Sequence, residues 1–207
     1  MAVIHHTTLV PTKLELVASW LPDQPWYERH GEAPNLAKAG GFRLDDPEGE
    51  VGIEFLVVSD SAGGTTTVYH VPLTYRGSPL EGAEAALIGT TEHGVLGTRW
   101  VYDGAADPVA RAQLAALIRG EAEPQAQSVS HTSDPTVLVH LESGAEPATD
   151  VRVVRVLRAE DANRAGDADA TEDETFARGA GHVIAGWTTP DGTESRGRFA
   201  VLDVAQG

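Results

Sequence analysis

The residues best suited to bind a ligand are the aromatic side chains of WLPDQPWY, residues 20–27. This segment holds two of the four Trp and one of the four Tyr in the chain. Aromatic rings stack on sugars and on bases, but Trp and Tyr also bury large apolar areas and anchor small cores. An apolar helix face precedes Trp20 and favours the core interpretation there. For Trp26 and Tyr27 both interpretations stay open.

Histidine and acidic side chains are the other groups that could do chemistry. Three of the eight His, namely His70, His140 and His182, occur singly in predicted strands. A zinc site needs three or four converging ligands, and no pair of His has a metal-binding spacing. The acidic segment 159–178 lacks the Gly and Glu positions of a calcium loop. With no Gly-rich phosphate motif and no GxSxG motif either, we expect no catalytic, cofactor-binding or metal-binding residue.

The charge of the chain excludes several classes of partner. It has 31 acidic and 15 basic residues in 207, a net charge of −16. Binding to nucleic acid or to an anionic membrane surface requires Lys and Arg to replace counterions, so we expect neither partner. Cysteine is absent, which excludes disulfides and fits a reducing compartment. With no secretory signal and no apolar run of spanning length, we predict a cytoplasmic protein.

Local signals predict the elements of the first half. Residues 2–10 are rich in strand formers, and Thr12 with Glu15 has the spacing of a capping box that opens a helix. Residues 50–59 and 66–76 predict a hairpin across DSAGG. Because Pro72 cannot donate a ladder hydrogen bond, we expect its strand to be an edge or to carry a bulge. Such an edge would make a homodimer possible.

Further along the chain, residues 79–90 suggest one or two helical turns and residues 98–102 a strand. The best-signalled helix begins after Asp107, with Pro at its first position, and ends before Gly120. The polar segment 121–134 that follows has no hydrophobic period. We therefore place the main boundary there, between a domain of residues 1–124 and a segment of residues 125–207.

The second segment is β-rich in character. Residues 136–141 and 150–158 read as strands, and 182–189 with 194–203 as a second hairpin across Pro190-Asp191-Gly192. The acidic residues 159–178 have almost no large apolar side chain, so we predict a mobile loop. Strands that arrive as hairpins favour an α+β fold, with an antiparallel curved sheet, two main helices and a β-rich C-terminal half.

Several of these segments together resemble a known family. A helix running into WLPxxxWY, a strand like VGIEFLVV, then YHVPLTYRG and the helix DPVARAQLAALIRG are similar to the N-terminal cap domain of maltokinases. The similarity covers about residues 10–120. The start of the chain, MAVIHHTTLVPTKLEL, suggests a stand-alone actinobacterial branch, some of whose members carry a glucan-branching label.

The resemblance implies a function in sugar metabolism. Maltokinases phosphorylate maltose with ATP in a route that links trehalose to glycogen-like α-glucan, and their catalytic body follows the cap. The strand VRVVRVLR faintly resembles the one that carries the ATP-binding Lys, and that position would be Arg155 here. Since Arg substitutes poorly for that Lys, the alternative is an ordinary strand with an exposed Arg.

From this resemblance we expect an accessory or regulatory cap-like protein. We favour a protein without enzymatic activity over an enzyme, and we expect no cofactor. Its partner would be an enzyme of the maltose, trehalose or glycogen pathway, or α-glucan itself. The alternative is a partner-dependent, ATP-dependent sugar phosphotransferase component. The candidate ligand or partner surface is Trp26, Tyr27, Tyr75 and Arg76. The ligand, the oligomeric state and whether the two halves share one sheet are not readable from the sequence.

Overall fold

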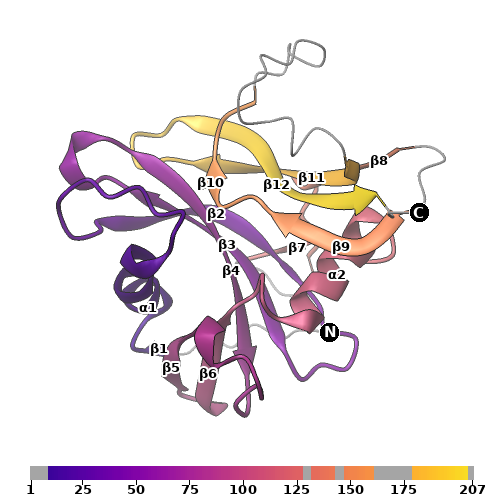
Figure 1. Cartoon of the computed structure of the whole chain (residues 1–207), viewed down its shortest axis with the longest axis horizontal. Coiled ribbons are helices and arrows are strands. Elements are labelled where there is room, and N and C mark those ends of the chain that lie inside the picture. The colour runs from indigo at the N-terminus through magenta and orange to yellow at the C-terminus, as the bar shows by residue number, and fades with distance from the viewer. Residues whose placement is uncertain (1–8, 128–131, 143–146, 161–178, 205–207) are drawn as a thin grey trace.

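The computed structural model describes residues 9–127, 132–142, 147–160 and 179–204 (Figure 1). The helices are α1 (Lys13–Trp20) and α2 (Pro108–Ile118), with short 3-10 turns at Leu21–Asp23, Ala62–Gly64 and Glu84–Ala86. The strands are β1 (Leu9–Val10), β2 (Leu36–Leu44), β3 (Gly52–Asp60), β4 (Thr67–Arg76), β5 (Leu87–His93), β6 (Gly97–Asp103), β7 (Gln125–Ala126), β8 (Leu138–Leu141), β9 (Pro147–Val153), β10 (Val156–Leu157), β11 (Gly179–Thr188) and β12 (Glu194–Val204).

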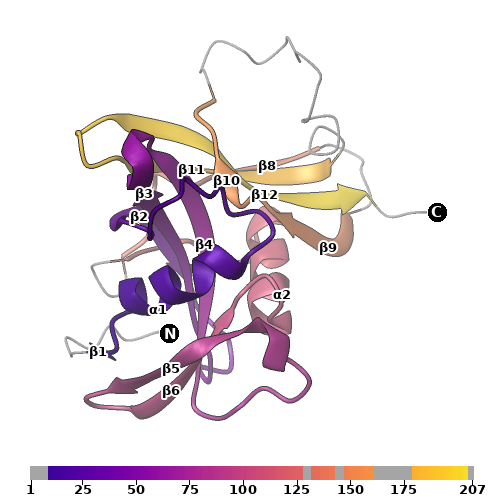
Figure 2. The same cartoon turned by 60° about the vertical axis from the view of Figure 1, so that its left-hand side comes forward.

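The strands form one antiparallel sheet that contains both halves of the chain. Its order is β1-β5-β6-β4-β3-β2-β11-β12-β9, with β7 on β2, β8 on β11 and β10 on β4. The halves meet where β11 pairs with β2, at Trp187 opposite Gly40. The sheet curves strongly, so that β11 and β12 cross over β2 to β4 (Figures 1 and 2). This two-helix, antiparallel architecture confirms the predicted α+β fold.

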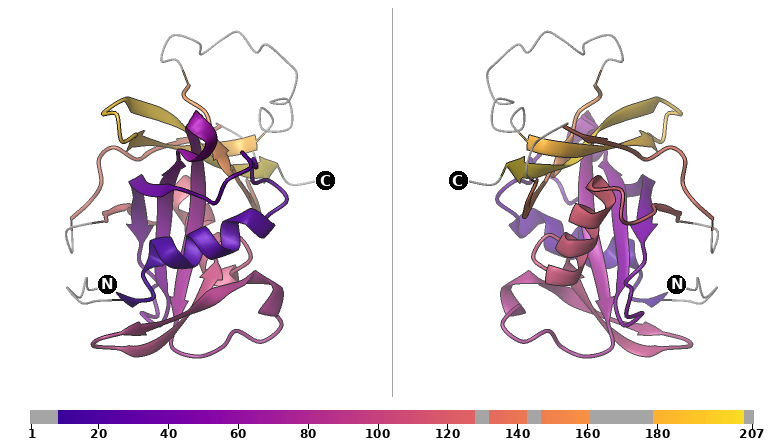
Figure 3. Two further views of the ribbon diagram at one scale, coloured as in Figure 1. Left: turned by 90° about the vertical axis from the view of Figure 1, so that its left-hand side faces the viewer. Right: turned by 90° about the vertical axis from the view of Figure 1, so that its right-hand side faces the viewer.

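The central strands are buried on both faces, which explains their nearly continuous apolar sequence. On β3, Phe55 and Val57 point into a core shared with α2, β11 and β12, while Leu56 and Val58 point toward α1. The two helices therefore lie on opposite faces of these strands (Figure 3). Alternate residues of one strand serve two separate hydrophobic cores, as the period of two requires.

The first helix begins as its sequence predicts. The Thr12 hydroxyl accepts a hydrogen bond from the Glu15 backbone, and a Glu15 carboxylate oxygen accepts one from the Thr12 backbone N–H at 2.7 Å. These two bonds satisfy donors that the first turn would otherwise leave unpaired. Val17 and Leu21 are fully buried against the sheet. The predicted capping box and apolar stripe are confirmed.

The position of Pro72 corrects one prediction. β4 is neither an edge strand nor bulged there, because it pairs with β3 without a register shift and with β10 and β6 on its other side. The pairing with β10 ends at Tyr69 and the pairing with β6 begins at Leu73. Pro72 lies in that gap, where its carbonyl accepts from the Gly104 N–H at 2.9 Å. A homodimer through this strand would therefore lack a free edge.

Other predicted elements are confirmed with adjusted bounds. Both hairpins form, as β3–β4 and β11–β12, and α2 ends before Gly120, whose φ of 74° lies in the left-handed region. The segment 150–158 divides into β9 and β10, and 79–90 forms a single 3-10 turn followed by β5. The strand at 2–10 is described only at β1, and the predicted loop falls largely on residues 161–178, outside the described residues.

No helix of the described chain is long and apolar enough to cross a membrane.

Candidate functional site

Trp26, the first of the candidate residues, lies at the centre of an aromatic and cationic cluster. Its ring centroid is 5.8 Å from that of Trp20, at 61° between the planes, and 5.9 Å from that of Tyr69 on β4. The guanidinium carbon of Arg155 lies 4.9 Å from the Trp26 ring centroid, over the ring. A cation over an indole face is an attractive contact. One face of Trp26 is therefore already covered by a side chain from the second half of the sequence.

Arg155 occupies a different environment from the one expected. It lies between β9 and β10, and its Nη2 donates to the Asp103 carboxylate on β6 at 2.5 Å. Its side chain is only 16% exposed and that of Asp103 only 13%. The expectation of an exposed Arg is wrong, because the chain passes here from β9, which pairs with β12, to β10, which pairs with β4 inside the sheet. Arg155 acts as a clamp that joins the second half of the chain to Trp26 and to β6.

Tyr27 is buried and holds a buried carboxylate. Its hydroxyl donates to Asp60 Oδ2 at 2.8 Å, and Asp60 also accepts from the backbone N–H groups of Asn35 and Ala62. Burial and then the neighbouring Asp60 raise the pKa of Tyr27 to about 12. The ring packs against Tyr69 at 5.5 Å. Tyr27 therefore anchors the segment that follows α1 to the end of β3.

The other two candidates, Tyr75 and Arg76, also point at carboxylates of the fold. The Tyr75 hydroxyl donates to Glu54 Oε2 at 3.0 Å, and burial, reinforced by Glu54, raises its pKa well above the usual range. Arg76 donates from Nε and Nη2 to the two oxygens of Asp107, each at 2.7 Å. This bidentate pair ties β4 to the first turn of α2.

The structure does not bring the four candidates into one site. Trp26 and Tyr27 contact Tyr69, whereas Tyr75 and Arg76 lie at the far end of β4. Tyr75 lies six positions after Tyr69 along the strand, a distance of roughly 20 Å. Whether any of them meets a ligand stays a prediction. Their observed contacts join the aromatic segment, the sheet and α2.

His70 is a titratable side chain buried inside the sheet. It is fully buried between the rings of Phe55 and Phe199, and its Nδ1 lies 3.0 Å from the carbonyl oxygen of Val154. Burial, and then the charge of Arg155, lower the pKa of His70 to about 3. The ring is therefore neutral near pH 7. Within the described residues, no three His, Asp or Glu side chains gather as a metal site would require.

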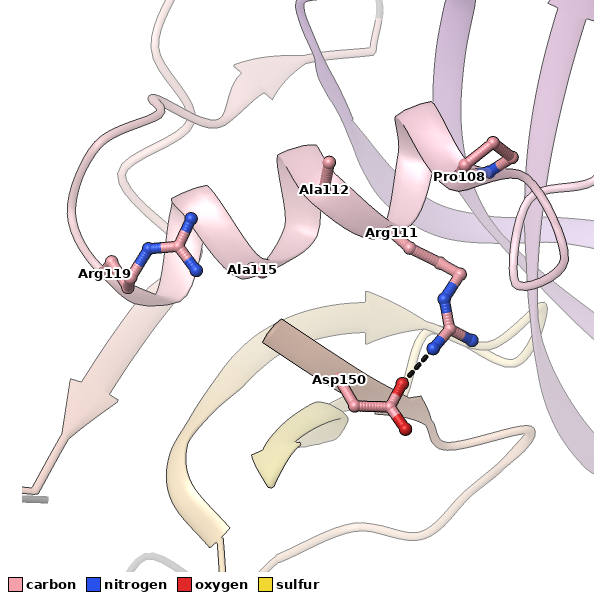
Figure 4. Close-up of a pocket in the computed structure, with 6 residues that line it drawn as sticks. All are labelled: Pro108, Arg111, Ala112, Ala115, Arg119 and Asp150. Atoms are coloured by element: carbon pink, nitrogen blue, oxygen red, sulfur yellow. Dashed lines mark hydrogen bonds and ion pairs between the residues drawn. The ribbon is translucent and has the colours of Figure 1, made fainter. Parts of the chain in front are cut away.

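A shallow pocket of about 360 Å³ lies between α2 and β9 (Figure 4). Arg111 and Arg119 stand toward its two ends, Ala112 and Ala115 lie between them, and Asp150 of β9 pairs with Arg111. The sequence gives no signal for this pocket, because its two walls lie far apart in the chain. Both arginines are engaged, since Arg119 pairs with Glu121 at 2.9 Å.

The fold and these contacts define an α+β protein. In its first part, a sheet with an aromatic cluster lies between two helices. Comparison with protein families finds a relative of this first part. Residues 20–107 match the maltokinase N-terminal cap domain, which confirms the resemblance read from the motifs. The matched segment runs from Trp20 to Asp107 and includes all four candidate residues. No curated protein matches the chain.

Proposed function

We propose that this chain is an accessory or regulatory protein of α-glucan and trehalose–maltose metabolism. In this proposal it acts in the cytoplasm, and its cap domain serves to bind a partner enzyme of that pathway. The observation that carries the proposal is the match of residues 20–107 to the maltokinase N-terminal cap domain. The contacts of the candidate residues support a role without catalysis, because their polar groups are already bonded within the fold. The partners are Asp60 for Tyr27, Glu54 for Tyr75 and Asp107 for Arg76.

The short strand β8 supports a protein partner. Its apolar side chains Leu138, Val139 and Leu141 are 50%, 44% and 40% exposed. It pairs with β11 on one side, and no strand among the described residues pairs with its other side. An edge with unpaired backbone groups and exposed apolar side chains favours addition of an extended segment from another protein. We propose β8 as the docking edge for the partner enzyme.

Recovery of a partner from a native cytosol tests this proposal. The wild-type chain is expected to enrich an enzyme of the maltose, trehalose or glycogen pathway, and Leu138→Lys to lose it, because a charge on the edge opposes strand addition. Val95→Lys is the matched control, since Val95 is 62% exposed and lies in the turn between β5 and β6. Equal urea midpoints for the two variants exclude unfolding as the cause.

Three results would count against the proposal. The first is recovery of neither a pathway enzyme nor α-glucan. The second is sedimentation of the pure protein as a dimer that Leu138→Lys dissociates, which would make a second copy the occupant of β8. The third is release of ADP from ATP in the presence of magnesium and maltose, which would favour the alternative of a sugar phosphotransferase component.

A further inference from the structure

Glu54 on β3 is a buried carboxylate with three donors of its own. It is 7% exposed. Lys13 of α1 lies 2.6 Å and the Gln127 amide 3.0 Å from its Oε1, and the Tyr75 hydroxyl donates to its Oε2 at 3.0 Å. A carboxylate with this set of partners is well compensated for its burial. Further cations beside it are therefore not required to neutralise it.

Two further cations nevertheless lie on the same face. Arg43 of β2 stands directly opposite Glu54 in the ladder, where Cβ atoms are about 5 Å apart. Lys38 of β2 stands opposite Val58, on the same side of the sheet. Neither forms an ion pair or a side-chain hydrogen bond with any residue that the structure describes. The cluster of Lys13, Lys38 and Arg43 thus carries three positive charges against one carboxylate.

Acidic residues outnumber basic ones by 31 to 15 in this chain. Lys38 and Arg43 nevertheless have no carboxylate partner among the described residues, whereas Lys13 pairs with Glu54. Burial, and then the positive charge of Lys13, lower the pKa of Lys38, while the carboxylate of Glu54 acts in the opposite direction. Lys13 and Lys38 are therefore close enough to repel each other. An added negative charge would relieve that repulsion.

A glycine lies between Lys38 and Arg43 on β2, and it leaves the backbone there without a side chain. Gly41 lies between Lys38 and Arg43 with a φ of 119°, and a Cβ there would fall 2.0 Å from the Phe55 carbonyl oxygen. A side chain is excluded at this position, and the Gln127 amide nitrogen lies 2.7 Å from where the Cβ would be. That amide gives one N–H to Glu54 and has a second to offer.

We propose that Lys38 and Arg43, with the Gln127 amide, bind the phosphate group of a small soluble molecule. A planar guanidinium and an ammonium are the usual pair for this chemistry, and the guanidinium can hold two phosphate oxygens at once. The site lies on the α1 face of β2, in the part of the chain that matches the cap family. It does not depend on the partner proposed above.

The test uses inorganic phosphate as the probe and the unfolding temperature of the full chain as the readout. Phosphate is expected to raise this temperature more than chloride does at equal ionic strength, because a ligand of the folded state stabilises it. Lys38→Gln and Arg43→Gln should each weaken the apparent affinity about tenfold. Arg158→Gln is the control, since Arg158 is exposed and lies after the end of β10, away from β2 in the sequence.

Equal stabilisation by phosphate and chloride, or an equal phosphate effect in all three variants, would overturn the site. Vesicles of anionic phospholipid form a second arm, because their headgroups carry the same phosphate. Binding to vesicles that both site variants lose would assign the site to a membrane and overturn the proposal of a soluble ligand.

Discussion

Replacing Asp107 with alanine is expected to lower the free energy of unfolding by about 3–5 kcal/mol. The Asp107 side chain is fully buried and does three things at once. It caps α2 by accepting from the Val109 N–H, it accepts two hydrogen bonds from Arg76, and it accepts one from the Thr74 hydroxyl. Alanine would leave the Arg76 charge and the first turn of α2 without a partner. Urea unfolding at pH 7 measures the loss.

The loss of unfolding free energy in Asp107→Ala is expected to depend on pH, because Asp107 is titratable. Burial by itself raises the pKa of Asp107, but the hydrogen bonds from Arg76, Thr74 and Val109 outweigh it, and the net pKa is lowered from 3.8. A carboxyl whose folded pKa is depressed stabilises the fold above its unfolded pKa and loses that contribution as the pH falls. The difference between wild type and Asp107→Ala should therefore shrink below about pH 4. A constant difference down to pH 2 would contradict this assignment.

Replacing Arg155 with alanine is expected to cost about 2–4 kcal/mol. The change removes the partner of Asp103 and the cation over the Trp26 ring. Since the Asp103 side chain is only 13% exposed, its charge would remain largely buried and without an ion-pair partner. Arg155→Lys should recover only part of the loss, because an ammonium lacks the planar fork. Urea unfolding followed by Trp fluorescence reports both the midpoint and the surroundings of Trp26.

Arg158→Ala serves as the matched control for this clamp. Arg158 is exposed and lies three residues further along the chain, so its removal should change the free energy of unfolding by less than about 0.5 kcal/mol. Equal small effects in both variants would mean that Arg155 does not join the two halves of the chain.

Elements with strong local signals could be predicted from the sequence. The capping box at Thr12, the Asp107-Pro108 start of α2 and the β3–β4 hairpin depend on residues within a few positions of one another. Such signals act through backbone hydrogen bonds and turn geometry, which the neighbouring sequence determines. The α+β class followed from these elements alone.

Features that depend on distant pairings could not be predicted. Pro72 suggested an edge strand, yet β10 and β6 meet β4 on either side of it from positions far along the chain. Arg155 likewise has its partners in Asp103 and Trp26, which no local pattern connects to it. The polar segment 121–134 signals a boundary, but the sheet continues across it through β11 and β2.

The sequence predicted the candidate residues from their residue types, and it did not predict their contacts. Their aromatic and cationic character was visible in the motifs, and all lie in the matched cap segment. Their buried partners are not visible, because Tyr27 and Asp60 are 33 residues apart and Arg76 and Asp107 are 31 apart. The cationic cluster around Glu54 was missed for the same reason, since it joins α1, β2, β3 and Gln127.

The aromatic segment WLPDQPWY is a seam that joins α1 to the sheet. Trp26 is half-buried, with contacts to Trp20, Tyr69 and Arg155. Truncating a large buried aromatic side chain costs about 3–5 kcal/mol, and a half-buried one about half of that. The urea midpoint of Trp26→Ala is therefore the most direct test, and we predict a loss of about 2 kcal/mol. An unchanged midpoint together with lost α-glucan binding would contradict the claim and make Trp26 a ligand platform.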